Sequence, residues 1–117
     1  MKKTLGDRIR ELREERDLSL REFARLLRDV SAAHLSDIEL GRRYPSDALL
    51  KKIAHELRAS IEELQHFDSR APVEDLKRRA EVDPTFGFAL RKLVEHDISS
   101  ADLLRLIDEK AKPEGSE

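Results

Sequence analysis

The sequence predicts an all-α protein, with five short helices followed by a C-terminal helical segment. Apolar residues recur every three or four positions through most of the 117 residues, which is the spacing of one helix face. No stretch alternates apolar and polar residues with the period of a strand. Serine is favoured before a helix because its hydroxyl accepts a hydrogen bond from a free backbone N–H. Runs with helical spacing follow four serines: Ser19, Ser31, Ser46 and Ser60.

These caps and the apolar spacing predict one domain of five helices over residues 1–67. Capping boxes, in which a serine and a glutamate three residues later bond each other's backbone, are expected at Ser19–Glu22 and Ser60–Glu63. Gly41 suits the position just after a helix, and Pro45 prevents the third helix from running into the fourth. The predicted helices cover residues 5–16, 20–27, 32–40, 47–57 and 61–66.

The segment "DSRAP" at residues 68–72 interrupts the helical spacing and is interpreted as a linker. The C-terminal helical segment, residues 73–112, follows it, and a disordered tail is expected over residues 113–117. Asp83 before Pro84 and Ser99 before an apolar run mark two of its helix starts. The predicted helices here cover residues 73–82, 84–95 and 100–111.

Composition excludes several classes of protein. The absence of cysteine excludes disulfides and thiolate metal sites and favours a reducing compartment. No membrane span or signal peptide is recognisable, so a cytoplasmic protein with no membrane partner is expected. The net charge of −2 divides into 14 Lys and Arg against 13 Asp and Glu in residues 1–67, and 9 against 12 in residues 68–117. Binding to nucleic acid would therefore depend on a local patch.

No pattern of an enzyme is present, and no cofactor or metal is expected. His55-Glu56 begins like a zinc-protease helix, but position 59 is Ala59 where a second histidine would be needed. The sequence contains no nucleophile elbow, and its four glycines form no phosphate-binding loop.

The second and third predicted helices are separated only by residues 28–30, a spacing typical of a helix-turn-helix. Leu35 and Ile38 form the buried side of the third helix, which leaves a face of small residues outward. Small side chains let a helix backbone approach base edges, and arginines just past Gly41 are placed to meet phosphates. The residues expected to face bases are Ala32, Ala33, Ser36 and Asp37.

The stretches "LSLREFARLL…VSAAHLSDIELGRRYPS" and "LLKKIAHELRASIEEL" resemble the phage-repressor-like (Xre/Cro) helix-turn-helix family over residues 5–66. The resemblance implies a lambda-repressor-like domain that binds operator DNA as a dimer, usually for repression. It implies that the third helix is the recognition helix, and that an ion pair between Arg13 and Glu39 joins the first helix to it. The phosphate contacts that it implies come from Ser31, Arg42, Arg43 and Tyr44.

Three positions depart from that family. Leu20 stands where the family often has a phosphate-binding glutamine, so this contact is missing or is replaced by Arg21. The turn usually contains a glycine; here Arg28 and Asp29 replace it, and Asp29 is expected to tolerate a left-handed backbone. Asp37 could accept a hydrogen bond from a cytosine amino group, or it could simply lower the affinity for DNA.

The last two helices are apolar and too short to be stable alone, so a surface must cover them. They are expected to form a homodimer interface, with packing on the first domain as the alternative. An alternative function is an antitoxin-like interaction module in which these helices bind a partner protein and DNA binding is autoregulatory. The family resemblance implies a toxin or a metallopeptidase as that partner. The residues assigned to the dimer interface are Phe86, Phe88, Leu93, Leu103, Leu106 and Ile107.

Overall fold

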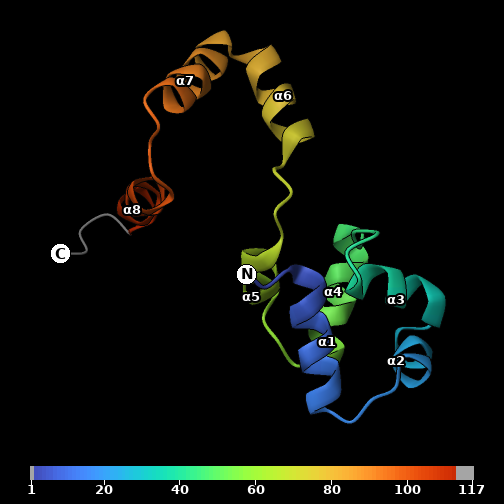
Figure 1. Cartoon of the computed structure of the whole chain (residues 1–117). Helices are drawn as coiled ribbons and strands as arrows, with labels where there is room; N and C mark the ends of the chain where they lie inside the picture. Colours follow the sequence, from blue (N-terminus) through green and yellow to red (C-terminus); the bar gives the residue numbers. More distant parts are fainter. Residues whose placement is uncertain (1, 113–117) are drawn as a thin grey trace. The chain divides into compact units, whose positions relative to one another are not determined.

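The computed structural model describes residues 2–112, and every regular element in that range is an α-helix (Figure 1). The chain divides into two units, with the boundary between Arg70 and Ala71. The expected tail at residues 113–117 lies outside the described residues. Helix bounds agree with the predicted ranges to within one residue at each end. The helices are α1 (Leu5–Glu15), α2 (Leu20–Leu27), α3 (Ala32–Glu39), α4 (Asp47–Glu56), α5 (Ile61–Phe67), α6 (Val73–Val82), α7 (Pro84–Glu95) and α8 (Ser100–Ala111).

Serine caps begin α2, α3, α4 and α5, as predicted: each hydroxyl accepts the N–H three residues later. The capping box at Ser19–Glu22 is complete, and a second complete box, at Thr4–Asp7, was not anticipated. The box expected at Ser60–Glu63 is only half formed, because the Glu63 carboxylate binds Arg8 of α1 instead. A long-range ion pair therefore replaces a local bond.

The first unit has one core, to which all five helices contribute. α1 packs on α3 and α5, α2 packs on α3 and α4, and α4 packs on α5. Phe23 of α2 is completely buried at the centre. The other buried apolar residues are Leu5, Ile9, Leu12, Ala24, Leu27, Leu35, Ile38, Leu50, Ile53, Ala54, Leu57 and Leu64.

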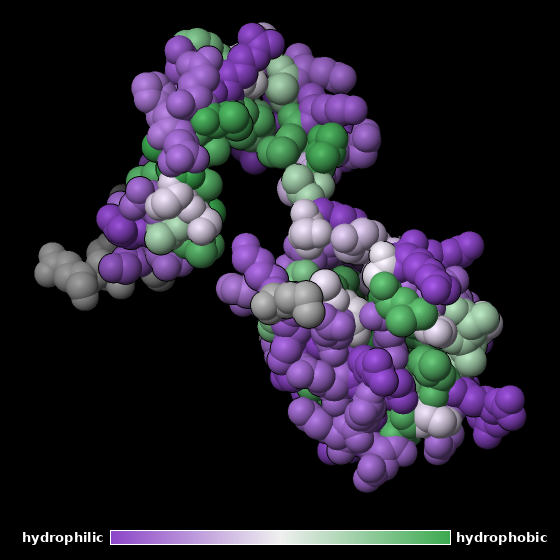
Figure 2. Space-filling view, viewed as in Figure 1, coloured by the Kyte–Doolittle hydropathy of each residue, from purple (hydrophilic) through white to green (hydrophobic). Residues whose placement is uncertain are grey.

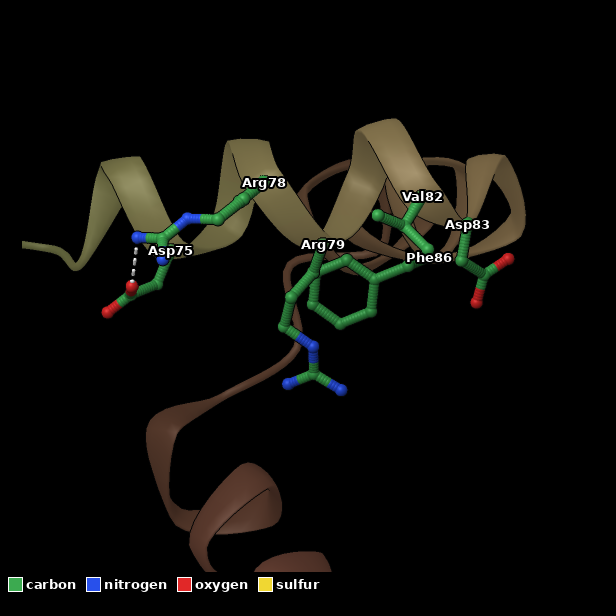
Figure 3. A pocket seen from close by; sticks show the side chains of 6 residues that line it. All are labelled: Asp75, Arg78, Arg79, Val82, Asp83 and Phe86. Atoms are coloured by element: carbon green, nitrogen blue, oxygen red, sulfur yellow. Dashed lines mark hydrogen bonds and ion pairs between the residues drawn. The ribbon is translucent and has the colours of Figure 1, made fainter.

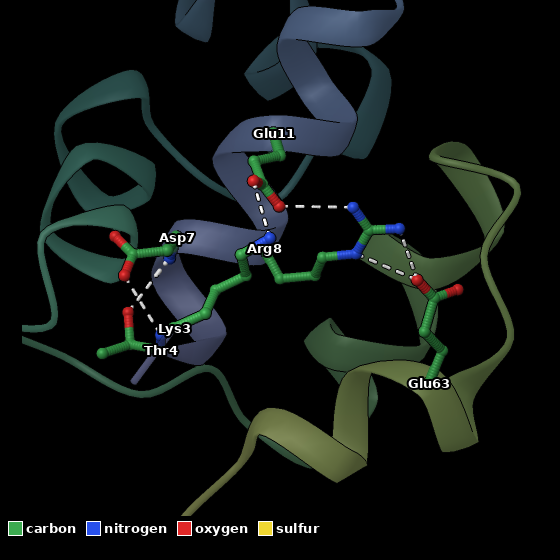
Figure 4. Close-up of polar contacts among 6 residues, drawn as sticks. All are labelled: Lys3, Thr4, Asp7, Arg8, Glu11 and Glu63. Atoms are coloured by element: carbon green, nitrogen blue, oxygen red, sulfur yellow. Dashed lines mark hydrogen bonds and ion pairs between the residues drawn. The ribbon is translucent and has the colours of Figure 1, made fainter. Parts of the chain in front are cut away.

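Polar contacts also join α1 to α5 (Figure 4). Arg8 donates from Nε and Nη2 to Glu63 Oε1, at 3.0 and 2.6 Å. Its Nη1 lies 3.3 Å from Glu11, which also binds Lys3 Nζ at 2.8 Å. These partners lower the pKa of Glu11, with the bond from Lys3 as the largest cause.

The second unit has no core of this kind. None of its described residues is buried, and α6 and α7 are the two helices that pack closely on each other. Gly87 of α7 faces Ala80 of α6 there. Figure 2 shows hydrophobic side chains at the surface of these helices. Several large apolar residues are at least half exposed: Val82, Phe88, Val94, Leu104, Leu106 and Ile107.

Candidate nucleic-acid interface

Helix α3 is held in place by α1. Gly6 of α1 lies against the carbonyls that end α3: a Cβ on it would come within 2.4 Å of the Glu39 oxygen and 2.5 Å of the Ile38 oxygen. The backbones of the two helices therefore touch. Arg13 binds the buried Glu39 carboxylate nearby, so the ion pair that the family resemblance implied is present. The spacing of apolar residues in the sequence did not predict the close approach of Gly6 to α3.

The outer side of α3 carries short side chains. Ala33 is exposed, and Ser36 and Asp37 are partly exposed. Ala32 is also half buried, where it packs against the core beside the start of the helix. The four residues predicted to face bases therefore differ in exposure, and Ala33 is the one freely open to solvent. Ser31, the cap, is exposed next to them.

The end of α3 is a tight, fully hydrogen-bonded turn. Gly41 has φ +79°, a left-handed conformation that glycine adopts at little cost. Its N–H bonds the Ile38 carbonyl at 3.1 Å, and the N–H of Arg42 bonds the Asp37 carbonyl at 2.8 Å. This is a Schellman motif, and it turns the chain sharply after the helix.

The two arginines after the turn surround the Asp37 carboxylate. Arg42 Nη1 is 3.7 Å and Arg43 Nε is 4.0 Å from its oxygens, and both arginine side chains are more than 60% exposed. Asp37 thus contacts the cations expected to bind phosphate, while it remains partly open to solvent. Exposed pairs at these distances are weak and can exchange partners easily.

The remaining predicted phosphate contacts lie at different places. Arg21, at the second position of α2, is exposed. Tyr44 is half exposed, but its hydroxyl is 3.1 Å from the Ser69 hydroxyl and its ring lies under Arg70.

The turn between α2 and α3 is feasible for a reason other than the one expected. Arg28, and not Asp29, has the positive φ, at 74°; it is the C-cap of α2, and the Asp29 N–H donates across it to the Leu27 carbonyl at 3.0 Å. Asp29 instead accepts a bond from Lys52 of α4 at 2.9 Å. The lysine lowers the pKa of Asp29, and the ion pair ties the turn to α4.

Within residues 2–112, no group of histidines and carboxylates is placed to hold a metal ion. No helix in that range is long and apolar enough to cross a membrane.

The first unit is a bundle of five helices, and its third helix carries short side chains on its exposed face. This is the architecture of a helix-turn-helix DNA-binding domain, and the family model described as helix-turn-helix matches residues 9–64. The chain belongs to this family, in its phage-repressor-like (Xre) branch, and is a DNA-binding transcriptional regulator and not an enzyme. It is 32% identical to the HTH-type transcriptional repressor RghR of Bacillus subtilis (strain 168), over 88% of this chain and 85% of that protein.

The chain is also similar in fold to solved structures of regulators. SinR, a master regulator for biofilm formation, in complex with DNA, shares 33% identity over 53% of this chain and 98% of that chain, with a TM-score of 0.50. The clp gene regulator ClgR of Corynebacterium glutamicum shares 25% identity over 93% of this chain and 92% of that chain, also at a TM-score of 0.50. The first of these likenesses is confined to about half of this chain, and the second extends over most of it.

Proposed function

We propose that the protein is a repressor that binds a palindromic operator as a homodimer and inserts α3 into the major groove. The observation that carries the proposal is the exposed small-residue face of α3, fixed by Gly6 and Arg13 and followed at once by two exposed arginines. Ala33 and Ser36 would approach base edges, and Arg42 and Arg43 would exchange Asp37 for phosphate oxygens. The similarity to a named repressor and to a regulator in complex with DNA supports this assignment.

The homodimer is supported by the second unit, since its described helices leave apolar surface uncovered. Of the six residues predicted at the interface, Phe86, Leu93 and Leu103 are half buried within their own chain, whereas the other three are exposed. Phe86 lies beneath the Arg79 guanidinium, whose carbon is 4.5 Å from the ring centroid.

A hollow of about 480 Å³ beside that ring is lined by both helices of the pair (Figure 3). Val82, at the edge of this hollow, is 85% exposed, and it was not among the residues predicted for the interface. Two copies brought together here would cover apolar surface that one copy leaves in water.

Selection from a random duplex pool with the full chain tests the proposal. An enriched palindrome, together with a dimer mass in solution, is the expected result. Enrichment of a single half-site by a monomer would contradict the homodimer, and a stoichiometric foreign protein retained during native purification would favour the interaction-module function instead.

The double variant Arg42→Ala with Arg43→Ala tests the phosphate contacts. It should weaken binding to all duplexes alike and reduce the slope of log affinity against log salt by roughly two. The matched control, Arg10→Ala with Arg91→Ala, removes the same charge elsewhere and should leave the slope nearly unchanged. Full affinity in the first variant would exclude the loop from the interface.

A further inference from the structure

Residues 68–70, which the sequence places in the linker, are fastened to the loop that follows α3. The Tyr44 hydroxyl is 3.1 Å from the Ser69 hydroxyl. The Arg70 guanidinium carbon lies 4.8 Å from the centre of the Tyr44 ring, which is a cation–π contact. Two neighbouring linker residues therefore hold one aromatic side chain of the loop.

Arg70 is itself fixed by the end of α5. Its Nε and Nη2 donate to the two carboxylate oxygens of Asp68, at 3.0 and 2.7 Å, and its backbone N–H donates to the same carboxylate at 3.0 Å. The Asp68 side chain is only 12% exposed, and its own N–H bonds the Gln65 carbonyl. The bond from Arg70 lowers the pKa of Asp68, so the carboxylate stays charged. The contact is thus attached to the end of α5 through the C-cap residue Asp68.

The loop side is equally well anchored. Pro45, next to Tyr44, is fully buried, and Arg43 precedes it on the surface proposed to contact phosphate. The chain leaving the DNA-binding unit is consequently held until Arg70. Only Ala71 and Pro72 separate Arg70 from the first residue of α6.

We infer that Asp68, Ser69 and Arg70 are positioning residues that clamp the start of the linker onto Tyr44 and so restrict the spacing of the operator half-sites. This inference rests on the proposed function. A free linker of Ala71 and Pro72 spans about 7 Å, whereas release of residues 68–70 would lengthen it to about 17 Å. The clamp therefore sets how far each DNA-binding unit can move from a dimer interface formed by the C-terminal helices.

Limited digestion of the full chain with trypsin tests the clamp without DNA. The bond after Arg70 is cleaved only when its guanidinium leaves Asp68 and Tyr44. Asp68→Ala and Tyr44→Ala should each speed this cleavage roughly tenfold relative to cleavage after Arg78 in the same digest, because both remove partners of Arg70. Ser69→Ala should have a smaller effect in the same direction. Equal rates in the wild type and in both alanine variants would overturn the clamp.

The spacing of half-sites tests its role in recognition. The wild-type chain should lose affinity steeply when base pairs are inserted between the half-sites of the selected palindrome. Arg70→Ala should bind the unaltered palindrome as before and tolerate the insertions at least roughly tenfold better. Arg70→Lys, which keeps a cation over the ring but loses the fork to Asp68, should fall between the two.

The two ideas fail in different ways. If no palindrome is selected or no dimer forms, the proposed function fails and the digestion result is unaffected. If the palindrome and dimer are found and Arg70→Ala has the same spacing profile as the wild type, only the positioning role is wrong.

Discussion

Arg13 of α1 and Glu39 of α3 form a two-pronged ion pair, with Nε 2.8 Å and Nη2 3.0 Å from the two carboxylate oxygens. Both side chains are almost covered, at 11% and 6% exposed. The third nitrogen of the guanidinium donates to the Leu18 carbonyl at 2.7 Å, so one side chain fixes both α3 and the turn before α2.

Arg13→Ala should destabilise the protein by about 3 kcal/mol, because it leaves the Glu39 charge buried without its partner. Urea unfolding followed by circular dichroism measures the loss. Arg10→Ala, which breaks the exposed pair with Glu14, is the control and should cost no more than about 0.5 kcal/mol. Equal effects of the two variants would contradict the structural role of Arg13.

Gly6→Ala should destabilise the first unit by about 1–3 kcal/mol, since its methyl group would meet the backbone of Glu39 and separate α1 from α3. The same experiment should show reduced DNA affinity. Gly87→Ala is the matched control: its added Cβ would lie 3.5 Å from Ala80, an ordinary contact, and α7 would gain helix propensity. A Gly6→Ala variant as stable as the wild type would disprove the close approach.

Arg58→Gly should stabilise the protein by about 0.5–1 kcal/mol, because Arg58 adopts φ 54° just after α4, a conformation that glycine enters without strain. The thermal midpoint should rise. Gly41→Ala replaces a glycine by alanine at φ +79°, and it should lower the thermal midpoint. Both shifts in one direction would be inconsistent with these backbone conformations.

The capping box of α2 should make stability depend on pH in acid. The Ser19 backbone N–H, and then its hydroxyl, lower the pKa of Glu22. The folded state therefore binds this proton less readily, so stability is complete above the unfolded pKa, about 4.3, and is lost as pH falls through the lower folded value. An NMR titration of the Glu22 carboxyl carbon should give a midpoint below about 4.3. A midpoint at or above the unfolded value would exclude the bond in solution.

Asp37→Asn should raise the affinity for all duplexes several-fold, because it removes the negative charge that holds Arg42 and Arg43. The Schellman turn should survive, since it uses the backbone carbonyl. Fluorescence anisotropy with random and selected duplexes provides the measurement, with Asp102→Asn as a remote control. Loss of preference for the selected duplex alone would instead show that Asp37 reads a base.

The fold was largely predictable because its helix ends are determined by local chemistry. Serine hydroxyls, Gly41 and Pro45 act within a few residues of their own position, and the helix bounds follow from them. The Arg13–Glu39 pair was accessible only through the family resemblance.

What the sequence could not supply depends on residues distant along the chain. Glu63 binds Arg8 and not the backbone of its own N-cap, Ser60. Gly6 packs against the end of α3, and Arg70 lies over the Tyr44 ring. Periodicity carries no information on such pairings. The positive φ of the turn after α2 was assigned to the wrong residue, because residue preference favoured Asp29, whereas Arg28 adopts it and the Asp29 N–H bonds the Leu27 carbonyl.

Backbone contact at Gly6 leaves α3 little freedom to tilt or slide against its own domain. If α3 cannot adjust its position on the proposed operator, the DNA must bend or twist to fit it. Pyrimidine–purine steps bend and unstack more easily than A-tracts. A rigidly held α3 would therefore discriminate between sites by their flexibility as well as by their base edges. Operators of this regulator should thus share deformable steps at positions that no side chain touches.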